Sequence, residues 1–302
     1  MFPSSRRDFL KQTALAATAV AVAPHAAIAA NKPGDPPSKD VPWYRRTLRW
    51  GQTNITEMDP ERYDIGWWRQ YWKRTETQGV IVNAGGIVAY YPTKVPLHHQ
   101  AEYLNGRDLF GELCRAAHED GLMVFARMDS NRAHEDLYHA HPDWFARRSN
   151  GQPYKADDLF VTCINSPYYE QYLPDVLREI VARSHPEGFT DNSWAGMGRA
   201  NICYCENCER KFRAKSGKAI PRQANWDDPD YRRWIMWNYE RRIEIWELNN
   251  TVTRAAGGPD CIWSGMNSGS VSSMATSFRD LKEICARANI LMLDHQRRDI
   301  SE

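Results

Sequence analysis

Six short apolar segments alternate with longer amphipathic segments along most of this 302-residue chain. Alternating strand and helix segments favour a parallel sheet, because neighbouring parallel strands need a long crossover connection that is usually helical. The predicted strands are Thr47–Asn54, Val80–Asn83, Leu122–Arg127, Gly188–Asp191, Cys261–Met266 and Ile290–Asp294. We therefore expect an α/β fold.

The segments between these strands carry apolar residues at three- and four-residue spacing, which is typical of amphipathic helices. The first helix is expected to have Asp59 as its N-cap and Pro60 as its first residue, and to end at Gly79. The other helices are expected over Arg107–Asp120, from Ser166-Pro167 onward, over Asp228–Ala256 and over Phe278–Ala288.

Polar side chains gather at the C-terminal ends of the predicted strands. They are Asn54, Asn83, Arg127, Asp129, Asp191, Asn267, Asp294 and His295. In a (β/α)8 TIM barrel this end of the strands carries the active site. A doubly wound sheet is the alternative, but no G-x-G-x-x-G sequence follows any predicted strand. We therefore favour a barrel of the TIM type.

A closed barrel of this type needs eight strands, so two strand–helix units are unassigned. We expect residues 43–302 to form an incomplete (β/α) barrel catalytic domain, truncated after about six βα units. Two alternatives are open: the barrel is split between two gene products, or further strands lie in the loops of residues 84–160.

Residues 1–29 resemble a twin-arginine export signal. Arg6 and Arg7 precede an apolar run over residues 13–23 that is too short to span a bilayer, and Ala27-Ile28-Ala29 supplies small residues for cleavage. Residues 30–42 are rich in proline, lysine and aspartate and are expected to form a linker. The mature protein is therefore expected to be periplasmic or secreted, without a membrane span.

Composition bears on the ligand. Lysine and arginine number 39 against 38 aspartate and glutamate residues, for a formal net charge of +1. With no basic excess to neutralise phosphates, we expect no binding to nucleic acid. Twelve tryptophans and 14 tyrosines accompany only nine phenylalanines. Because tryptophan and tyrosine combine apolar faces with polar edges, this bias suits a sugar ligand; a tryptophan-rich core is an equal alternative.

Three cysteines lie close together at Cys203, Cys205 and Cys208. A C-x-C-x-x-C turn can present three thiolates to a tetrahedral zinc ion, and a closed structural site needs a fourth ligand. Cys163 is the expected fourth ligand because it lies in a loop before a helix. A disulfide between Cys205 and Cys208 is the alternative, since an exported protein meets an oxidising compartment. The remaining cysteines, Cys114, Cys261 and Cys285, are expected to be core thiols.

The element Cys163-Ile-Asn165-Ser166-Pro167, followed by Cys203-x-Cys205-x-x-Cys208, resembles the zinc-bearing barrels of the family 42 β-galactosidases. The closer resemblance is to a hypothetical glycosyl hydrolase group that includes glycoside hydrolase family 151, the α-L-fucosidases. It covers about residues 43–302. It rests on Tyr91-Pro92-Thr93-Lys94, Leu97-His98-His99, Arg107 to Glu112, Ala126-Arg127-Met128-Asp129 and His141 to Phe145.

The chain departs from family 42 at the end of the fourth predicted strand. That family has Asn-Glu there, whereas this chain has Thr190-Asp191-Asn192. The departure argues against β-galactosidase chemistry and matches the fucosidase-like families, in which an aspartate nucleophile ends that strand. Family members also continue through the barrel into a trimerisation domain, for which residues 1–302 hold no counterpart.

Hydrolysis of a glycosidic bond uses two carboxyl groups. The resemblance and its place at a strand end imply Asp191 as the nucleophile, with nearby donors that hold its pKa low. Asp294 is the expected general acid and base, in competition with Asp129, Glu57 and Glu112. The expected substrate-binding residues are His98, His99, Arg127, Asp129, Trp194, Asn54, Asn267 and His295.

These observations predict an exported glycoside hydrolase, of the retaining, exo-acting α-L-fucosidase type, with a structural zinc ion. The expected partner is an oligosaccharide or glycoside, with a homo-oligomer or a further C-terminal segment as additional expectations. The alternative is a catalytically inactive truncated or split barrel that at most binds sugar. A metal-dependent hydrolase is a third option, and it would need zinc with an open coordination position.

Overall fold

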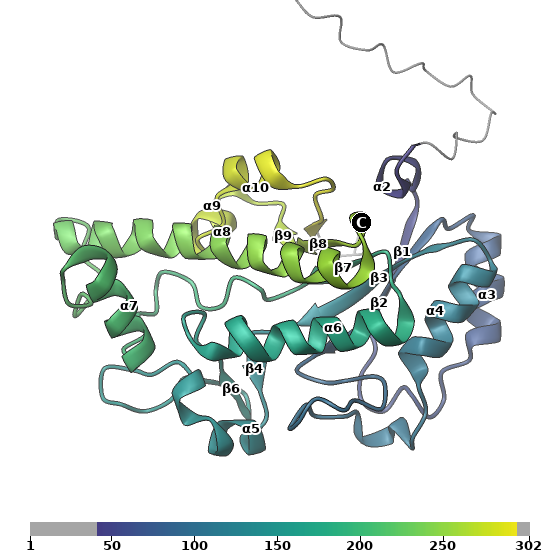
Figure 1. Cartoon of the computed structure of the whole chain (residues 1–302), viewed down its shortest axis with the longest axis horizontal. Helices are drawn as coiled ribbons and strands as arrows, with labels where there is room; N and C mark the ends of the chain where they lie inside the picture. Colours follow the sequence, from purple (N-terminus) through teal and green to yellow (C-terminus); the bar gives the residue numbers. More distant parts are fainter. Residues whose placement is uncertain (1–40, 295–302) are drawn as a thin grey trace, which may run out of the picture. The chain divides into compact units, whose positions relative to one another are not determined.

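The computed structural model describes residues 41–294, and its centre is a parallel sheet of five strands (Figure 1). The strands are β1 (Trp50–Thr53), β2 (Gly79–Gly86), β3 (Met123–Asp129), β7 (Gly188–Asp191) and β8 (Ile262–Gly265). Their order in the sheet is their order in the chain, and every neighbouring pair is parallel. This arrangement confirms the predicted α/β fold of the barrel type.

A sixth strand follows the same order. Soon after β8 the chain forms β9 (Asn267–Ser268), which pairs in parallel with β10 (Leu293–Asp294). The hydroxyl of Ser264 in β8 also donates to the carbonyl of Ile290, just before β10. The six predicted strand segments are therefore neighbours in the structure in the same order as in the chain.

Four helices cover one face of the sheet in chain order. They are α3 (Ile65–Arg74), α4 (Leu109–Glu119), α6 (Leu173–Ser184) and α8 (Pro229–Gly257), and α8 runs alongside α6 (Figure 1). Their apolar faces and the helix-facing strand residues form the largest hydrophobic cluster. The other α-helices of the described residues are α2 (Trp43–Arg46), α5 (Glu135–Ala140), α7 (Glu206–Ser216), α9 (Val271–Thr276) and α10 (Leu281–Arg287).

The other face of the sheet forms a second apolar layer. Ile81, Phe125 and Ile262, from three of the strands, pack together with Trp43 of α2. Side chains alternate between the two faces of a strand, so Phe125 and Arg127 of β3 share the inner face while Met128 faces the helices. This alternation decides which strand-end residues reach the inside of the barrel.

The beginning of the first helix differs from the prediction. Asp59 accepts hydrogen bonds from the amide and hydroxyl of Thr56 and so stabilises a turn, whereas Asp64 caps α3 through the amide of Trp67. Gly79 does not end the helix but begins β2, because α3 already ends at Arg74. Carboxyl groups of both aspartates have the chemistry of an N-cap, so local sequence did not distinguish them.

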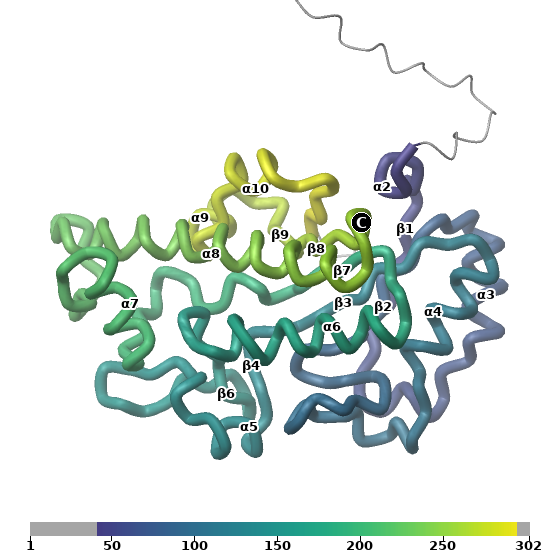
Figure 2. Tube along the Cα trace, in the orientation of Figure 1, coloured from purple at the N-terminus to yellow at the C-terminus, as the bar shows by residue number. Residues whose placement is uncertain are grey.

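Besides β3 and the end of β2, the segment over residues 84–160 contains three further strands, and these lie outside the parallel sheet. β4 (Arg132–Ala133), β5 (Lys155–Ala156) and β6 (Leu159–Val161) form a small antiparallel sheet in the order β4-β6-β5. In Figure 2 it lies beside α5, away from the strands of the barrel. Hidden barrel strands in this segment, one of the sequence-based alternatives, are therefore not found.

The remaining predicted helices lie in the expected segments, but they begin differently from the prediction. The segment after Ser166-Pro167 begins with a π-helical turn, Tyr168–Tyr172, whose buried tyrosines lead directly into α6. The last helix begins at Leu281 rather than Phe278, because Phe278 has a φ of 59° and Asp280 is the N-cap. Within residues 41–294 no helix is long and apolar enough to cross a membrane. The twin-arginine segment and nearly all of the predicted linker lie outside the described residues.

Candidate active site and metal centre

The C-terminal ends of β2 and β3 place a polar layer inside the barrel. Arg127 and Asp129 follow Phe125 at two-residue spacing and so continue its inner face. With its amide oxygen turned toward β3, Asn83 accepts from Arg127 Nη1 at 3.2 Å and donates to the Thr53 carbonyl at 3.3 Å. Both Arg127 and Asp129 are half-buried, so a ligand at the strand ends can reach them.

Asp191 lies on the opposite face of the sheet, which the helices cover. It alternates with Thr190 and shares the helix-facing side of β7 with Phe189, a member of the cluster beneath the helices. Its carboxyl group is fully buried. Asp191 Oδ2 accepts from Ser130 Oγ at 2.5 Å, and Oδ1 accepts from the amides of Ser130 at 3.3 Å and Ser193 at 3.2 Å.

Ser193 links the two aspartates. Its amide donates to Asp191, and its hydroxyl donates to Asp129 Oδ1. Asn192 Nδ2 lies 3.4 Å from Asp129 Oδ2. The turn after β7 therefore holds a half-exposed carboxylate and a buried one through a single serine, a connection that sequence reasoning did not find.

Burial decides the protonation of Asp191. It raises the pKa of this carboxyl from 3.8 to about 7, and the charge of Asp129 adds to this rise, against the lowering by the Ser130 and Ser193 donors. The expectation that donors keep this pKa low is therefore wrong, because full desolvation of the carboxylate outweighs three hydrogen bonds.

A second polar group lies on the loops that follow β1, β2 and β4. His99 Nε2 lies 3.0 Å from Glu57 Oε2, and the rings of His99 and His134 stack at 3.7 Å with an interplanar angle of 15°. Glu57 Oε2 also accepts from the amide of Glu102 at 2.9 Å. Burial, followed by the charge of His99, lowers the pKa of His134. The sequence indicated Glu57 and His99, but it did not indicate His134.

His98 and Trp194 lie in the core. His98 is 5% exposed, and burial lowers its pKa to about 4. Trp194 is fully buried against Trp246 and Trp263, and its indole nitrogen donates to the Met266 carbonyl at 3.1 Å. Neither ring presents a face to a sugar, so the expected contacts of these two residues with substrate do not fit the structure.

The other predicted residues lie apart from one another. Asn54 is exposed at the end of β1 and accepts from Gln52 Nε2 at 2.9 Å. Asn267 is buried and donates to the Gly265 carbonyl. Asp294 is half-buried in β10, while His295 falls outside the described residues. Glu112 lies on α4 and pairs with Arg107, which precedes this helix.

The four predicted metal ligands come together. Cys163, Cys203, Cys205 and Cys208 are buried, and each offers a sulfur within 4.8 Å of the others. Sγ of Cys163 lies 3.3 Å from that of Cys208, 3.4 Å from that of Cys205 and 3.9 Å from that of Cys203. A zinc ion bound tetrahedrally by four thiolates at about 2.3 Å separates the sulfurs by about 3.8 Å, so this donor set fits zinc.

Hydrogen bonds to the sulfurs support thiolate ligands. The amide of Arg147 donates to Cys203 Sγ at 3.4 Å, the amide of Asn165 donates to Cys163 Sγ at 3.4 Å, and Asn165 Nδ2 donates to Cys208 Sγ at 3.2 Å. Such donors orient and stabilise metal ligands.

None of the seven cysteines, all within residues 41–294, forms a disulfide. Cys114 and Cys261 are buried as expected, but Cys285 is exposed because α10 buries its neighbour Ile284 instead.

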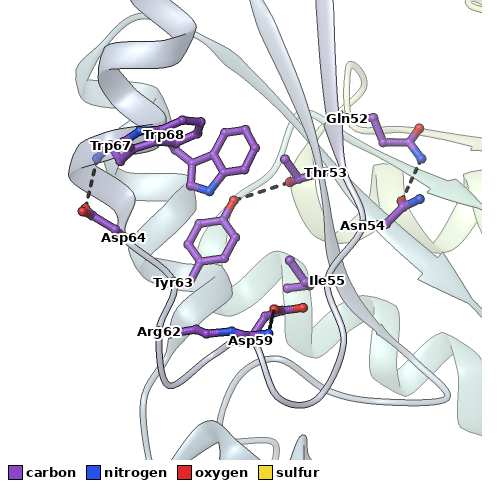
Figure 3. A pocket seen from close by; sticks show the side chains of 10 residues that line it. All are labelled: Gln52, Thr53, Asn54, Ile55, Asp59, Arg62, Tyr63, Asp64, Trp67 and Trp68. Carbon is purple, nitrogen blue, oxygen red and sulfur yellow. Dashed lines mark hydrogen bonds and ion pairs between the residues drawn. The ribbon is translucent and has the colours of Figure 1, made fainter.

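An open cleft lies between the C-terminal end of β1 and the beginning of α3 (Figure 3). Its volume is about 660 Å³. It is lined by Gln52, Thr53, Asn54, Ile55, Asp59, Arg62, Tyr63, Asp64, Trp67 and Trp68. Asn54 is the one predicted site residue in this lining.

Residues 69–193 match the family model described as "Hypothetical glycosyl hydrolase 6". The match begins in α3, covers β2, β3 and β7, and ends at Ser193, so it includes Asp129 and Asp191. A comparison of the sequence with curated proteins finds no match.

Solved glycoside hydrolases share the fold at low sequence identity. The glycoside hydrolase domain of PgaB (BpsB) from Bordetella bronchiseptica has a TM-score of 0.64 at 14% identity, covering 81% of this chain and 73% of that one. A β-galactosidase from the psychrophilic Marinomonas ef1 has a TM-score of 0.58 at 13% identity, with 82% and 41% covered. α-L-Fucosidase isoenzyme 2 from Paenibacillus thiaminolyticus has a TM-score of 0.54 at 16% identity, with 71% and 32% covered.

The chain thus spans about a third of that fucosidase and two fifths of that galactosidase. Residues 41–294 have the fold of the (β/α)-barrel glycoside hydrolases, and their central part is similar in sequence to a hypothetical glycosyl hydrolase family.

Proposed function

We propose that this protein is a glycoside hydrolase whose reaction takes place at the C-terminal ends of β2, β3 and β7. The observation that carries the proposal is the match of residues 69–193 to a glycosyl hydrolase family, because that segment supplies Asp129, Asp191 and the serine between them. The (β/α)-barrel fold supports it, since enzymes of this fold place their sites at these strand ends.

The geometry favours Asp129 over Asp191 as the carboxylate that meets the substrate. Asp129 is half-exposed on the inner face and is held by Ser193 and Asn192. Asp191 is buried, so we assign it a positioning role: it orients the Ser193 turn that in turn orients Asp129. In this proposal Asp129 takes the place of Asp191, which the sequence indicated as the nucleophile.

Glu57 is the carboxyl group that we propose as the partner of Asp129. It lies in the loop that follows β1, in which the carbonyl of Ile55 accepts from the Tyr90 hydroxyl at 3.0 Å. Glu57 is fixed by His99 and by the amide of Glu102. A pair of carboxyl groups on either side of a sugar is the machinery that glycoside hydrolysis uses. Asp294 stays a candidate from the sequence.

Finer assignments are proposals of the same kind. We propose an α-L-fucoside as the first substrate to test, because the family that the sequence resembles includes α-L-fucosidases and one structural neighbour is an α-L-fucosidase. Export by the twin-arginine route, followed by a periplasmic or secreted location, is proposed from residues 1–29 alone. A zinc ion at the four cysteines is proposed as a structural ion, since four thiolates leave no position for water.

The test is turnover of a panel of 4-nitrophenyl glycosides that includes the α-L-fucoside. We expect Asp129→Asn to lower kcat/KM by about 10²-fold to 10⁴-fold, because the amide cannot carry the charge or proton of the carboxylate. Asp175→Asn, on exposed α6 surface, is the matched control and should leave kcat/KM unchanged.

Two outcomes would oppose this proposal. Undiminished turnover by a correctly folded Asp129→Asn variant would remove Asp129 from the site. No turnover of any glycoside by the wild type, together with retained sugar binding, would favour the inactive barrel that the sequence left open.

A further inference from the structure

The cleft beside β1 has an aromatic wall, in which Trp68 packs against the core and Trp67 is exposed. Trp67 is 51% exposed, although it is one of the largest apolar side chains of the protein. Tyr71 stacks on one face of it, with ring centroids 5.4 Å apart and an angle of 14°, and Trp68 meets it edge-on. About half of the Trp67 side chain is therefore accessible in the cleft lining, where it can meet a flat apolar ligand surface such as one face of a sugar ring.

This wall is held in place from below. Trp68 stacks on Tyr63, with centroids 5.8 Å apart, and the Tyr63 hydroxyl lies 3.5 Å from Thr53 Oγ1 at the end of β1 (Figure 3). Asp64 caps α3 at the amide of Trp67, which fixes the first turn of the helix. A rigid aromatic surface loses little conformational entropy on binding.

The polar groups of the cleft suit hydroxyl groups. Gln52 and Asn54 extend their amides from β1 and bond to each other at 2.9 Å, leaving further donor and acceptor capacity on both side chains. Asp59 and Arg62, which both line the cleft, form an ion pair at 3.3 Å. Planar amides and a carboxylate are the groups that bind sugar hydroxyls through directional hydrogen bonds.

The charged residues that line the cleft favour a neutral sugar over an anionic one. Asp59 and Asp64 face the single cation of Arg62, so the cleft carries one net negative charge. Hydrogen bonding from the Thr56 amide is the largest of the effects that lower the pKa of Asp59, so its carboxyl group stays ionised. A uronate or sulfated sugar would be repelled, whereas a neutral sugar would not.

The loop after β1 connects the cleft lining to Tyr90 and Glu57. Ile55 lines the cleft, and its carbonyl accepts from the Tyr90 hydroxyl at 3.0 Å. Glu57 follows two residues later and bonds to His99. A glycan that extends from Trp67 along this loop would approach Glu57.

We propose that the cleft between β1 and α3 is a binding subsite for a sugar unit of a neutral glycan chain, stacked on Trp67 and hydrogen-bonded by Gln52 and Asn54. Its place as a subsite of the reaction rests on the proposed glycosidase activity, but binding of glycan in the cleft does not. The protein would therefore act on, or hold, oligosaccharides and polysaccharides rather than single glycosides alone.

Affinity electrophoresis of the full chain in native gels tests this, with galactomannan, xyloglucan or arabinoxylan as neutral probes and polygalacturonate as the anionic probe. We expect the wild type to be retarded by at least one neutral polysaccharide and not by polygalacturonate. Trp67→Ala should weaken that association by about tenfold, the loss expected for one stacked aromatic contact. Gln52→Ala, which leaves the aromatic wall intact, should weaken it as well.

Trp226→Ala is the matched control, because Trp226 is 52% exposed but lies outside the cleft, against Tyr231. It should leave retardation unchanged, and its turnover of a 4-nitrophenyl glycoside should equal that of the wild type. Equal retardation of the wild type and both cleft variants, or no retardation by any neutral probe, would overturn the subsite. Trp67-dependent retardation without any turnover would instead keep the subsite and reject the glycosidase.

Discussion

The carboxyl group of Asp191 is fully buried, with both oxygens accepting hydrogen bonds from serines. Three donors would lower the pKa of an exposed carboxyl, but desolvation raises this one to about 7. The proton that it binds therefore links folding to pH. Asp129, only one serine away, keeps contact with solvent and so can serve in chemistry that Asp191 cannot reach.

This linkage predicts the pH dependence of stability. The folded protein keeps the proton of Asp191 up to about pH 7, whereas the unfolded chain releases it near its ordinary pKa of 3.8. Folding therefore binds a proton between these values, and the free energy of unfolding falls as pH rises from about 4 to about 7. The neutral side chain of Asp191→Asn removes this effect.

As pH rises from 4 to 8, the free energy of unfolding of Asp191→Asn should therefore increase relative to that of the wild type by on the order of 4 kcal/mol. The altered hydrogen bonds of the variant add a difference that does not depend on pH. Urea unfolding at several pH values measures the change. Asp175→Asn, exposed on α6, should show no such trend, and parallel curves for wild type and Asp191→Asn would contradict the burial argument.

At the level of strands, the inner layer depends on a close approach between β3 and β7. A Cβ on Gly188 would lie 2.2 Å from Phe125 Cε1 and 2.5 Å from the Ile262 carbonyl oxygen. The Phe125 ring occupies the space where β7 would otherwise place a side chain. Since the backbone of β8 cannot move without breaking its pairing with β7, this position accepts only glycine.

Gly188→Ala should therefore destabilise the protein by about 1–3 kcal/mol, as overpacking of a core does. Thermal unfolding would show it as a melting temperature lower by roughly 2–4 °C per kcal/mol in a protein of this size. Gly51→Ala is the control, because a Cβ there meets Thr77 Cγ2 at an ordinary 3.5 Å. A melting temperature equal to that of the control would show that β7 and β8 can separate at low cost.

Across the whole protein, the four cysteines join segments that are far apart in the chain. Cys163 lies before the π-helical turn that leads into α6, whereas the other three precede or begin α7. They belong to a hydrophobic cluster separate from the main core, built around α7 and the first half of α8. A metal ion here closes a loop of about forty residues and so stabilises this cluster by restricting the unfolded chain.

We expect purified protein to contain about one zinc ion per chain and to lose it in Cys208→Ser, with a melting temperature several degrees lower. Metal analysis and thermal unfolding measure the two effects together. Cys285→Ser, at the exposed cysteine of α10, should leave both unchanged. A protein free of zinc whose mass shows the loss of hydrogens from two thiols would favour the disulfide between Cys205 and Cys208 instead.

Local sequence was sufficient for the six predicted strands and for α3, α4, α6, α8 and α10, but it did not predict α7 or the small antiparallel sheet. Strands such as Gly188–Asp191 and the long helix after Asp228 were predicted from periodicity and caps, and the structure places them within a few residues. The grouping of Cys163 with the C-x-C-x-x-C turn was also predicted, because few residue types bind zinc and their spacing is specific. Errors arose where two residues had equal local chemistry, as with Asp59 and Asp64 at the first helix.

The amino-acid pattern alone thus established a strand–helix alternation and a polar set of strand ends, because hydrophobic periodicity and ligand chemistry act over a few residues. It could not decide which polar residues face a ligand. Whether Trp194 is core or Trp67 is exposed, and whether Asp191 or Asp129 meets solvent, depends on which layer each strand face packs against. That packing is set by contacts between residues distant in the chain, so the tertiary fold determines burial, and burial determines charge and access.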